Sequence, residues 1–498
     1  MNVLKKTRVV LAIIFITSIT LLFLDYTGTI HKWLDWTAKI QFMPALLAIN
    51  IGVIILLCVL TLLFGRIYCS AICPLGIFQD IVLWFSNRRK KKKYRFSYAP
   101  AINWLRYGML AIFIIAFIAG IGSVVALLDP YSSYGLIASN LFAPVYQWIN
   151  NLLAYFAERA DSYAFYSVDV WMKSLPTFIV AVVIFITVII LPWLKGRIYC
   201  NTICPVGTIL GLISRFSFFR PTINAEKCNS CGLCDRICKA QCINPKEHKI
   251  DYSRCVTCMD CIDNCSQKAI TYQLYSKKKA EAKVEAKATD ESKRNMLTVS
   301  AALLATSLLK AQEKKVDGGL AYIEDKKIPE RQTRLVPAGS QSLRNFSKHC
   351  IGCQLCVSVC PNQVLRPSTN LLTLLQPEMS YERGYCRPEC NKCSEVCPAG
   401  AIKPISIADK SSTQIGHAVW IEKNCIVLTD NVECGNCVRH CPSGAITMLP
   451  SNPEDESSLK TPVVNEARCI GCGACENLCP ARPFSAIYVE GHNVHKEI

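Results

Sequence analysis

The sequence predicts a multi-domain protein in which an α-helical membrane domain of four spans precedes two α+β ferredoxin-like domains that bind 4Fe-4S clusters. Three observations predict this fold class. The chain of 498 residues has a mean hydropathy of +0.26, which is too apolar for an ordinary soluble protein. Its long apolar stretches precede a region dense in cysteine. The 30 cysteines recur mostly at short fixed spacings, which suit metal better than disulfide bonds.

Residues 1–220 are expected to form the membrane domain. Four apolar stretches are long enough to cross about 30 Å of hydrocarbon, namely 8–25, 42–64, 102–127 and 177–194. Lys and Arg gather before the first stretch and between the second and third, so the positive-inside rule places the N-terminus and the 65–101 loop in the cytoplasm. We therefore expect a multi-pass protein of the bacterial inner membrane, in contact with lipid. The net charge of +18 comes largely from Lys and Arg residues placed as membrane topology demands, so no nucleic-acid partner is expected.

The membrane domain contains a parallel internal repeat. GRIYCSAICPLG at 65–76 returns as GRIYCNTICPVG at 196–207. Both copies follow a span that runs inward, so their cysteines are expected to meet on one face. Pro74 and Pro205 are expected to open a helix after each cysteine pair. The candidate redox thiols are Cys69, Cys73, Cys200 and Cys204; the alternative is that they are small packing residues where the chain enters the membrane.

The sequence lacks the residues that usually bind haem in a membrane domain. None of the seven histidines lies in a predicted span, and the chain has no Cys-x-x-Cys-His motif. The sequence also has no Gly-rich dinucleotide fingerprint, P-loop or Ser/His/Asp arrangement.

Residues 221–275 are expected to form a cytoplasmic domain with two clusters. Its cysteines repeat with gaps of two, two and three, the bacterial ferredoxin run in which the fourth cysteine of each motif serves the neighbouring cluster. Lys239 and Ser266 stand where proline usually follows, and Cys242 is an extra cysteine. The expected ligand sets are Cys228, Cys231, Cys234 and Cys265 for one cluster, and Cys255, Cys258, Cys261 and Cys238 for the other.

Residues 315–498 contain four further motifs, each of which ends in Cys-Pro. The second widens its first gap to three residues and the third to eight. An Ala-Ile pair after three of the motifs, at Ala401, Ala445 and Ala486, resembles the start of a short strand. Zinc is the rival ligand, but the third, closely spaced cysteine favours clusters. Two pairings stay open. Either neighbouring motifs pair with each other, or the two outer motifs pair and the two inner motifs pair. The ligands are Cys350, Cys353, Cys356, Cys360; Cys386, Cys390, Cys393, Cys397; Cys425, Cys434, Cys437, Cys441; and Cys469, Cys472, Cys475, Cys479.

The segment between the two cysteine-rich parts indicates on which side of the membrane the last domain lies. Residues 276–294 form a Lys/Ala/Glu-rich linker, and 295–311 form a short apolar segment. Ser292 to Leu297 resembles a degenerate twin-arginine export signal with Lys293 in the place of the first arginine. The four-cluster domain is then periplasmic; the alternative is a cytoplasmic packing helix.

Together these motifs resemble a known family. Residues 1–275 resemble NapH, the membrane ferredoxin-type subunit of periplasmic nitrate reductase systems, and its relatives NosR and CcoG; residues 292–498 resemble the periplasmic subunit NapG. The resemblance implies a quinol dehydrogenase module with six 4Fe-4S clusters that takes electrons from menaquinol to a periplasmic reductase or cytochrome. NosR's flavin-binding domain has no evident counterpart, so no flavin is expected.

Two other functions fit the same motifs. The protein could deliver electrons that mature or reactivate a partner's metal centre, or act as a redox sensor, for which the sequence shows no output domain. About 30 Å of lipid would separate the two cluster domains. Quinone diffusion, the four repeat cysteines or another subunit must then bridge the gap. No quinone pocket is evident, and Trp104, Arg106 and Asp129 near span ends are typical of interface anchors.

Overall fold

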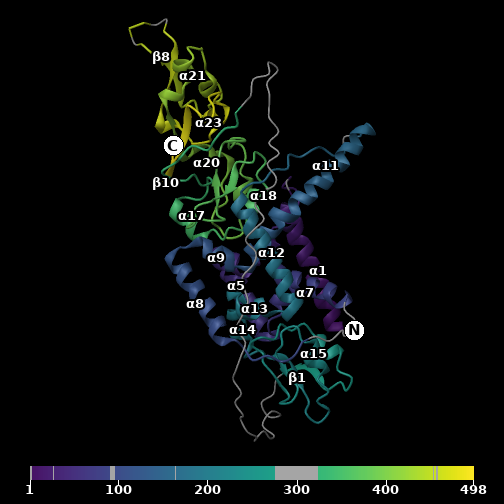
Figure 1. The fold of residues 1–498 in the computed structure, drawn as a ribbon. Coiled ribbons are helices and arrows are strands. Elements are labelled where there is room, and N and C mark those ends of the chain that lie inside the picture. The colour runs from purple at the N-terminus through teal and green to yellow at the C-terminus, as the bar shows by residue number, and fades with distance from the viewer. Residues whose placement is uncertain are drawn as a thin grey trace, which may run out of the picture.

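The computed structural model describes residues 3–25, 27–89, 96–162, 164–274, 324–452, 454–455 and 458–498. A helical region lies in the middle of the molecule (Figure 1). A small domain with β1 and α15 lies at the end near the N-terminus, and a larger domain with the C-terminus lies at the opposite end. The expected linker 276–294 and apolar segment 295–311 lie outside the described residues.

Two described helices are long and apolar enough to cross a membrane: α1 (Val3–Leu24) and α12 (Leu175–Lys195). Three shorter helices are also apolar: α5 (Ile51–Phe64), α8 (Asn103–Ala119) and α14 (Pro205–Ser214). The other helices of this region are α2 (His31–Leu34), α3 (Trp36–Lys39), α4 (Phe42–Leu47), α6 (Tyr68–Ala71), α7 (Pro74–Arg89), α9 (Gly122–Leu128), α10 (Pro130–Ile137), the π-helix η1 (Ala138–Phe142), α11 (Ala143–Arg159) and α13 (Ile198–Thr202).

The expected stretches 42–64 and 102–127 are not continuous helices, which corrects the prediction. The first is divided into α4 and α5, because the Asn50 side chain accepts the Val53 N–H and starts a new helix. The second is divided into α8 and α9 at Gly120, which has a positive φ of 74° and ends α8. Hydropathy does not detect these breaks because the residues on both sides are apolar.

The segment between the third and fourth apolar stretches, which the spans would leave as a loop, begins with buried helix. All eight residues of α10 are buried, and the chain continues through η1 into α11. The Asp129 carboxylate caps α10 by accepting the Ser132 N–H at 2.8 Å.

The small domain, residues 219–274, is built from two antiparallel pairs of strands and two short helices. β1 (Phe219–Ile223) pairs with β4 (Ile270–Leu274), so that the first and last segments of the domain lie together. β2 (Ile243–Asn244) pairs with β3 (Lys249–Ile250). The helices are α15 (Leu233–Ile237) and α16 (Asp260–Asp263).

The C-terminal domain has three antiparallel strand pairs among its described residues. They are β5 (Leu365–Pro367) with β6 (Pro377–Met379), β7 (Thr413–Trp420) with β10 (Ile487–Glu497), and β8 (Ile446–Pro450) with β9 (Lys460–Val464). Its helices are α17 (Leu343–His349), α18 (Leu355–Ser358), α19 (Lys392–Glu395), α20 (Ile407–Ser412), η3 (Glu422–Asn424), α21 (Ile426–Thr429), α22 (Asn436–Arg439), η4 (Glu466–Arg468) and α23 (Ala474–Leu478).

Two of the three Ala-Ile pairs lead into strands. β8 begins directly after Ala445, and β10 directly after Ala486. No strand follows Ala401, which corrects that part of the prediction. Pro404 lies close after this pair and has no N–H to donate to a partner strand.

The two cysteine-rich domains contact opposite ends of α1. Near its N-terminus, Lys5 Nζ pairs with Asp260 Oδ1 at 2.8 Å and with Asp263 Oδ2 at 3.2 Å, both in the small domain. Beyond its C-terminus, the Thr27 carbonyl accepts a hydrogen bond from Lys392 Nζ of the large domain at 2.8 Å. The helical region therefore separates the two domains, as Figure 1 shows.

Candidate metal centres

The cysteines of the C-terminal domain gather around four cavities. Each cavity is lined by the first three cysteines of one motif and the last cysteine of its sequence neighbour, so the first motif pairs with the second and the third with the fourth. The alternative that outer motifs pair with outer ones does not match this arrangement. The four sets are Cys350, Cys353, Cys356 and Cys397; Cys360, Cys386, Cys390 and Cys393; Cys425, Cys434, Cys437 and Cys479; and Cys441, Cys469, Cys472 and Cys475.

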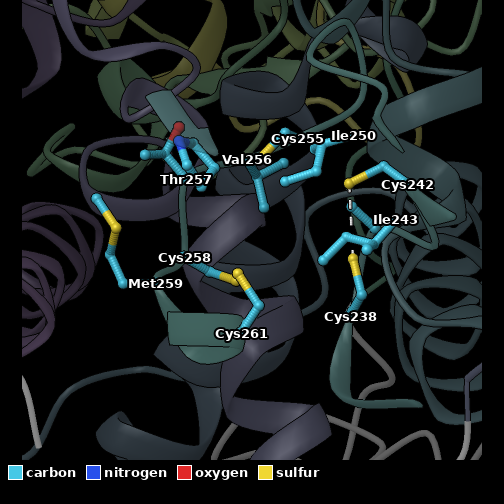
Figure 2. A pocket seen from close by; sticks show the side chains of 12 residues that line it. Cys238, Cys242, Ile243, Ile250, Cys255, Val256, Thr257, Cys258, Met259 and Cys261 are labelled. Atoms are coloured by element: carbon cyan, nitrogen blue, oxygen red, sulfur yellow. Dashed lines mark hydrogen bonds between the residues drawn. The ribbon is translucent and has the colours of Figure 1, made fainter. Parts of the chain in front are cut away.

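In the small domain too, the fourth cysteine of one motif lines the cavity formed by the other motif. Figure 2 shows a cavity lined by Cys238 together with Cys255, Cys258 and Cys261. Cys242 lies beside this set, with its sulfur 3.6 Å from that of Cys238. The other expected set is less enclosed: Cys234 lies within electrostatic range of Cys228 and Cys231, and Cys265 packs against the same core.

Backbone N–H groups point at the last cysteine of four motifs. Ala269 N donates to Cys265 Sγ at 3.3 Å, and Ile402 N donates to Cys397 Sγ at 3.5 Å. Ala445 N and Ala486 N each donate at 3.3 Å to Cys441 and Cys479. Such N–H···S bonds stabilise thiolate and tune the potential of a bound cluster. The Ala-Ile pairs noted in the sequence thus also supply donors to the thiolates.

The spacing of these side chains fits a cluster better than a single ion. Within the residues that the structure describes, no three Cys, His, Asp or Glu side chains are close enough to hold one metal ion. A 4Fe-4S cluster binds each thiolate to a different iron, so its four ligands stand farther apart than those of zinc. The cavities enclosed by four cysteines therefore fit 4Fe-4S clusters.

Neighbouring sites of the C-terminal domain are in direct backbone contact. Cys386 N donates to the Cys472 carbonyl at 2.9 Å, which joins the second and fourth motifs. Tyr381 is fully buried beside both cysteines, and its hydroxyl donates to the Gly471 carbonyl at 2.6 Å. The first motif contacts the helical region, where Asn140 Nδ2 donates to Gln354 Oε1 at 3.1 Å.

The structure brings the four repeat cysteines together. Cys69, Cys73, Cys200 and Cys204 are buried in one core. Helix α7 begins at Pro74 and α14 begins at Pro205, so the prediction for these prolines is confirmed. Cys58 lies apart from this group, half-buried on α5.

Three fully buried arginines were not recognised in the sequence as site residues. Arg66 and Arg197 belong to the two copies of the motif, and their duplication was the signal that could have found them. Arg106 is not a membrane-interface anchor, because it donates to the Ser253 hydroxyl and carbonyl at 3.0 and 3.1 Å. Asp129 is also buried, and only Trp104 of the three expected anchors is exposed.

Lys239, which replaces the usual proline, joins the small domain to the helical region. Its Nζ pairs with Asp260 at 2.8 Å and with Asp80 of α7 at 3.4 Å. Its carbonyl accepts the Arg197 N–H at 2.8 Å. Burial opposes the charge of Lys239, but Asp80 and Asp260 outweigh it and raise the pKa of the amine above its usual value. The replacement of proline thus creates a docking contact.

Family models of 4Fe-4S proteins match parts of both the helical region and the C-terminal domain. A family model described as a 4Fe-4S binding domain matches residues 46–93 and again residues 177–224. A model described as a 4Fe-4S dicluster domain matches 349–401, which contains the first two motifs of the C-terminal domain, and 432–482, which contains the other two except Cys425. No solved structure matches the chain.

Several curated relatives are ferredoxin-type proteins. The chain is 31% identical to the methylamine utilization ferredoxin-type protein MauM of Methylobacillus flagellatus over 170 residues, which is 32% of this chain and 70% of MauM. It is 26% identical to the ferredoxin-type protein NapH of Haemophilus influenzae over 231 residues, 45% of this chain and 67% of NapH. It is 23% identical to the regulatory protein NosR of Stutzerimonas stutzeri over 205 residues, 40% of this chain and 23% of NosR.

The chain is 34% identical to an uncharacterized protein of Methanocaldococcus jannaschii over 89 residues, which is 18% of this chain and 35% of that protein. The MauM match combines an identity above 30% with coverage of 70% of that relative. The chain therefore belongs to the family of ferredoxin-type 4Fe-4S proteins that includes MauM and NapH and is related to NosR.

Proposed function

We propose that this iron–sulfur electron-transfer protein is a membrane-bound quinol dehydrogenase module that takes electrons from menaquinol and passes them to a periplasmic reductase or cytochrome. The observation that carries the proposal is the contact of the two cysteine-rich domains with opposite ends of the apolar helix α1. At about 1.5 Å per residue, its 22 residues are long enough to cross the hydrocarbon core.

The order of the cysteine sets supports a path along the molecule. In the C-terminal domain, the set with Cys350 faces the helical region, and the set with Cys386 lies next to that of Cys472. In the small domain, Ser253, two residues before Cys255, accepts hydrogen bonds from Arg66 and Arg106 of the helical region. Each domain thus presents one set toward the helices and another away from them.

The proposal includes six 4Fe-4S clusters, held by the 24 cysteines of the six motifs, because four thiolates complete the iron coordination of each cluster. Such clusters accept and release one electron at a time. It also includes four spans in the bacterial inner membrane, formed by α1, by α4 together with α5, by α8 together with α9, and by α12. Residues 221–275 are then cytoplasmic and 315–498 periplasmic.

Quinol oxidation in lipid vesicles tests this function. The full chain, purified and reconstituted without oxygen, is given a menaquinol analogue, and cluster reduction is followed by EPR and by bleaching of visible absorbance. Each quinol should release two protons and two electrons, and the clusters should be reduced within turnover times. Ferricyanide, which does not cross lipid, should then reoxidise them only from the side of the C-terminal domain.

The matched control is Cys437→Ala, which removes a ligand far from the helical region. It should leave quinol-driven reduction intact and lower only the reoxidation by ferricyanide. Full reduction by dithionite with none by menaquinol would contradict the quinol dehydrogenase function. Reduction of a partner metalloenzyme in few turnovers would then favour maturation.

A further inference from the structure

Four buried thiols that belong to none of the six motifs meet inside the helical region. Cys69 lies in α6 and Cys200 in α13, and each is followed by a second cysteine, Cys73 or Cys204, directly before the next helix. Cys204 lies within electrostatic range of the other three thiols, and Cys73 within range of Cys69 and Cys200. Residues 131 positions apart in the chain thus form one group.

The two pairs are held in equivalent turns. Gly207 N donates to Cys204 Sγ at 3.4 Å, and Gly76 N makes the equivalent bond to Cys73. A Cβ on Gly76 or Gly207 would lie only 2.2 Å from the carbonyl oxygen of the first cysteine in the same copy. Both turns therefore require glycine, and both supply an N–H donor to sulfur, as four of the ferredoxin motifs also do.

A buried cation lies against these thiols without a carboxylate partner. Arg66 is fully buried, and its Nη2 lies 3.8 Å from Cys69 Sγ. Its other bonds go to neutral acceptors, the Asn201 side chain at 2.8 Å and two backbone carbonyls at 3.1 Å. In the part of the chain that the structure describes, no carboxylate pairs with it. Burying an unpaired guanidinium is costly, so the arrangement favours an anion at the thiols.

Four thiolates around one 4Fe-4S cluster are such an anion. Each copy of the motif supplies only two cysteines to the group, so a complete ligand set needs both copies. The model described as a 4Fe-4S binding domain matches both copies, and neither matched range contains a cysteine of the six ferredoxin motifs. Cys58 falls in the first range but lies outside the shared core.

The group lies between the two cysteine-rich domains. On one side, Arg197 is within electrostatic range of both Cys200 and Cys258 of the small domain. On the other side, Asp129 is within range of both Cys73 and Cys353 of the large domain. The thiols therefore occupy the gap that separates the innermost sets of the two domains.

We infer that Cys69, Cys73, Cys200 and Cys204 together hold a seventh centre, one 4Fe-4S cluster shared between the two copies of the motif. It relays single electrons between the Cys255 set and the Cys350 set; each electron that enters leaves again, and no bond or proton is exchanged. The relay role rests on the proposed function, whereas the presence of the cluster does not.

Iron and sulfide analysis of the full chain, purified without oxygen, tests the site. The wild type should contain about 28 irons, and the double variant Cys69→Ser/Cys200→Ser about four fewer, as a seventh 4Fe-4S cluster requires. Mössbauer and EPR spectra should lose one component and keep the rest. The matched control Cys58→Ser removes a cysteine of the same region and should keep all the iron.

A variant that retains all four thiols covers the case in which the double variant fails to fold. Arg66→Gln removes a positive charge that stabilises the reduced cluster, so one midpoint potential should fall while the others stay. Unchanged iron in the double variant, or a disulfide among the four cysteines of the wild type, would overturn the proposal. Seven clusters without oxidation of menaquinol would leave the site intact and overturn only the quinol dehydrogenase function.

Discussion

Arg66 and Arg197 occupy equivalent positions in the two copies of the motif, and each donates a hydrogen bond to a cysteine carbonyl of the other copy. Arg66 Nη2 lies 3.1 Å from the Cys200 oxygen, and Arg197 Nη1 lies 2.7 Å from the Cys69 oxygen. Because both guanidiniums are fully buried, these bonds satisfy donors that water cannot reach. The two copies are thus interlocked, although they stand 131 positions apart.

Asp80 neutralises one of these arginines, so its loss should be costly. Its carboxylate pairs with Arg197 Nη2 at 2.7 Å and with Arg8 Nη1 at 3.0 Å. Asp80→Asn leaves a buried guanidinium unpaired and should destabilise the protein by about 3–5 kcal/mol. Thermal unfolding in detergent, followed by circular dichroism, measures the loss.

Asp35→Asn is the control for that prediction, because the Lys39–Asp35 pair is mostly exposed and should contribute at most about 1 kcal/mol. Equal losses in the two variants would show that the Asp80 pairs do not stabilise the fold.

The pairing of the C-terminal motifs predicts which double variants lose more iron than single ones. Cys397 shares a cavity with Cys350, whereas Cys390 lines the neighbouring cavity. Cys397→Ala should lose one cluster, about four irons, and adding Cys350→Ala should remove no more. Adding Cys390→Ala instead should remove a second cluster. Iron analysis distinguishes the two double variants, and a loss of about eight irons in both of them would contradict neighbour pairing.

The cysteine spacing made the ligand candidates recognisable from sequence because three of each four ligands are local in the chain. In the C-terminal domain, the partner of each fourth cysteine could not be predicted, since both pairings satisfy the same spacings and only tertiary packing distinguishes them. Cys397 thus depends on how its motif sits against Cys350, not on its own neighbours.

Hydropathy predicted α1 and α12, which contain long apolar stretches, but not the buried path between α8 and α11. Segments such as α10 bury hydroxyls and glycine against other helices, and this depends on partners that a local pattern does not contain. The buried arginines were missed for the same reason: a lone Arg66 or Arg106 suggests an exposed side chain until its acceptors are known.

The burial of His495 predicts that the stability of the β7–β10 strand pair depends on pH. Burial, with a smaller contribution from His492, lowers the pKa of His495 to about 4. An unfolded histidine binds its proton near pH 6.5, so the unfolded state takes up protons first as the pH falls. The stability of this pair should be full above about pH 6.5 and should fall between about pH 6.5 and 4.

Hydrogen exchange of β10 amides at several pH values measures that effect, after correction for the intrinsic rate. His495→Gln should flatten the dependence. A variant whose protection falls as steeply as that of the wild type would assign the effect to other groups.

Gly135 allows the large domain to approach the helical region, and its substitution should weaken that contact. A Cβ at this position of α10 would lie 2.6 Å from the Cys353 carbonyl oxygen and 2.8 Å from the Phe23 ring. Gly135→Ala should therefore cost about 1–3 kcal/mol of stability and raise the hydrogen exchange of residues 351–355. Gly108→Ala is the matched control, because Gly108 also lies in a helix and has nothing within 4 Å of its Cβ position. Alanine there should stabilise by up to about 1 kcal/mol through helix propensity, so a Gly135→Ala variant as stable as the control would show that the close approach is not needed.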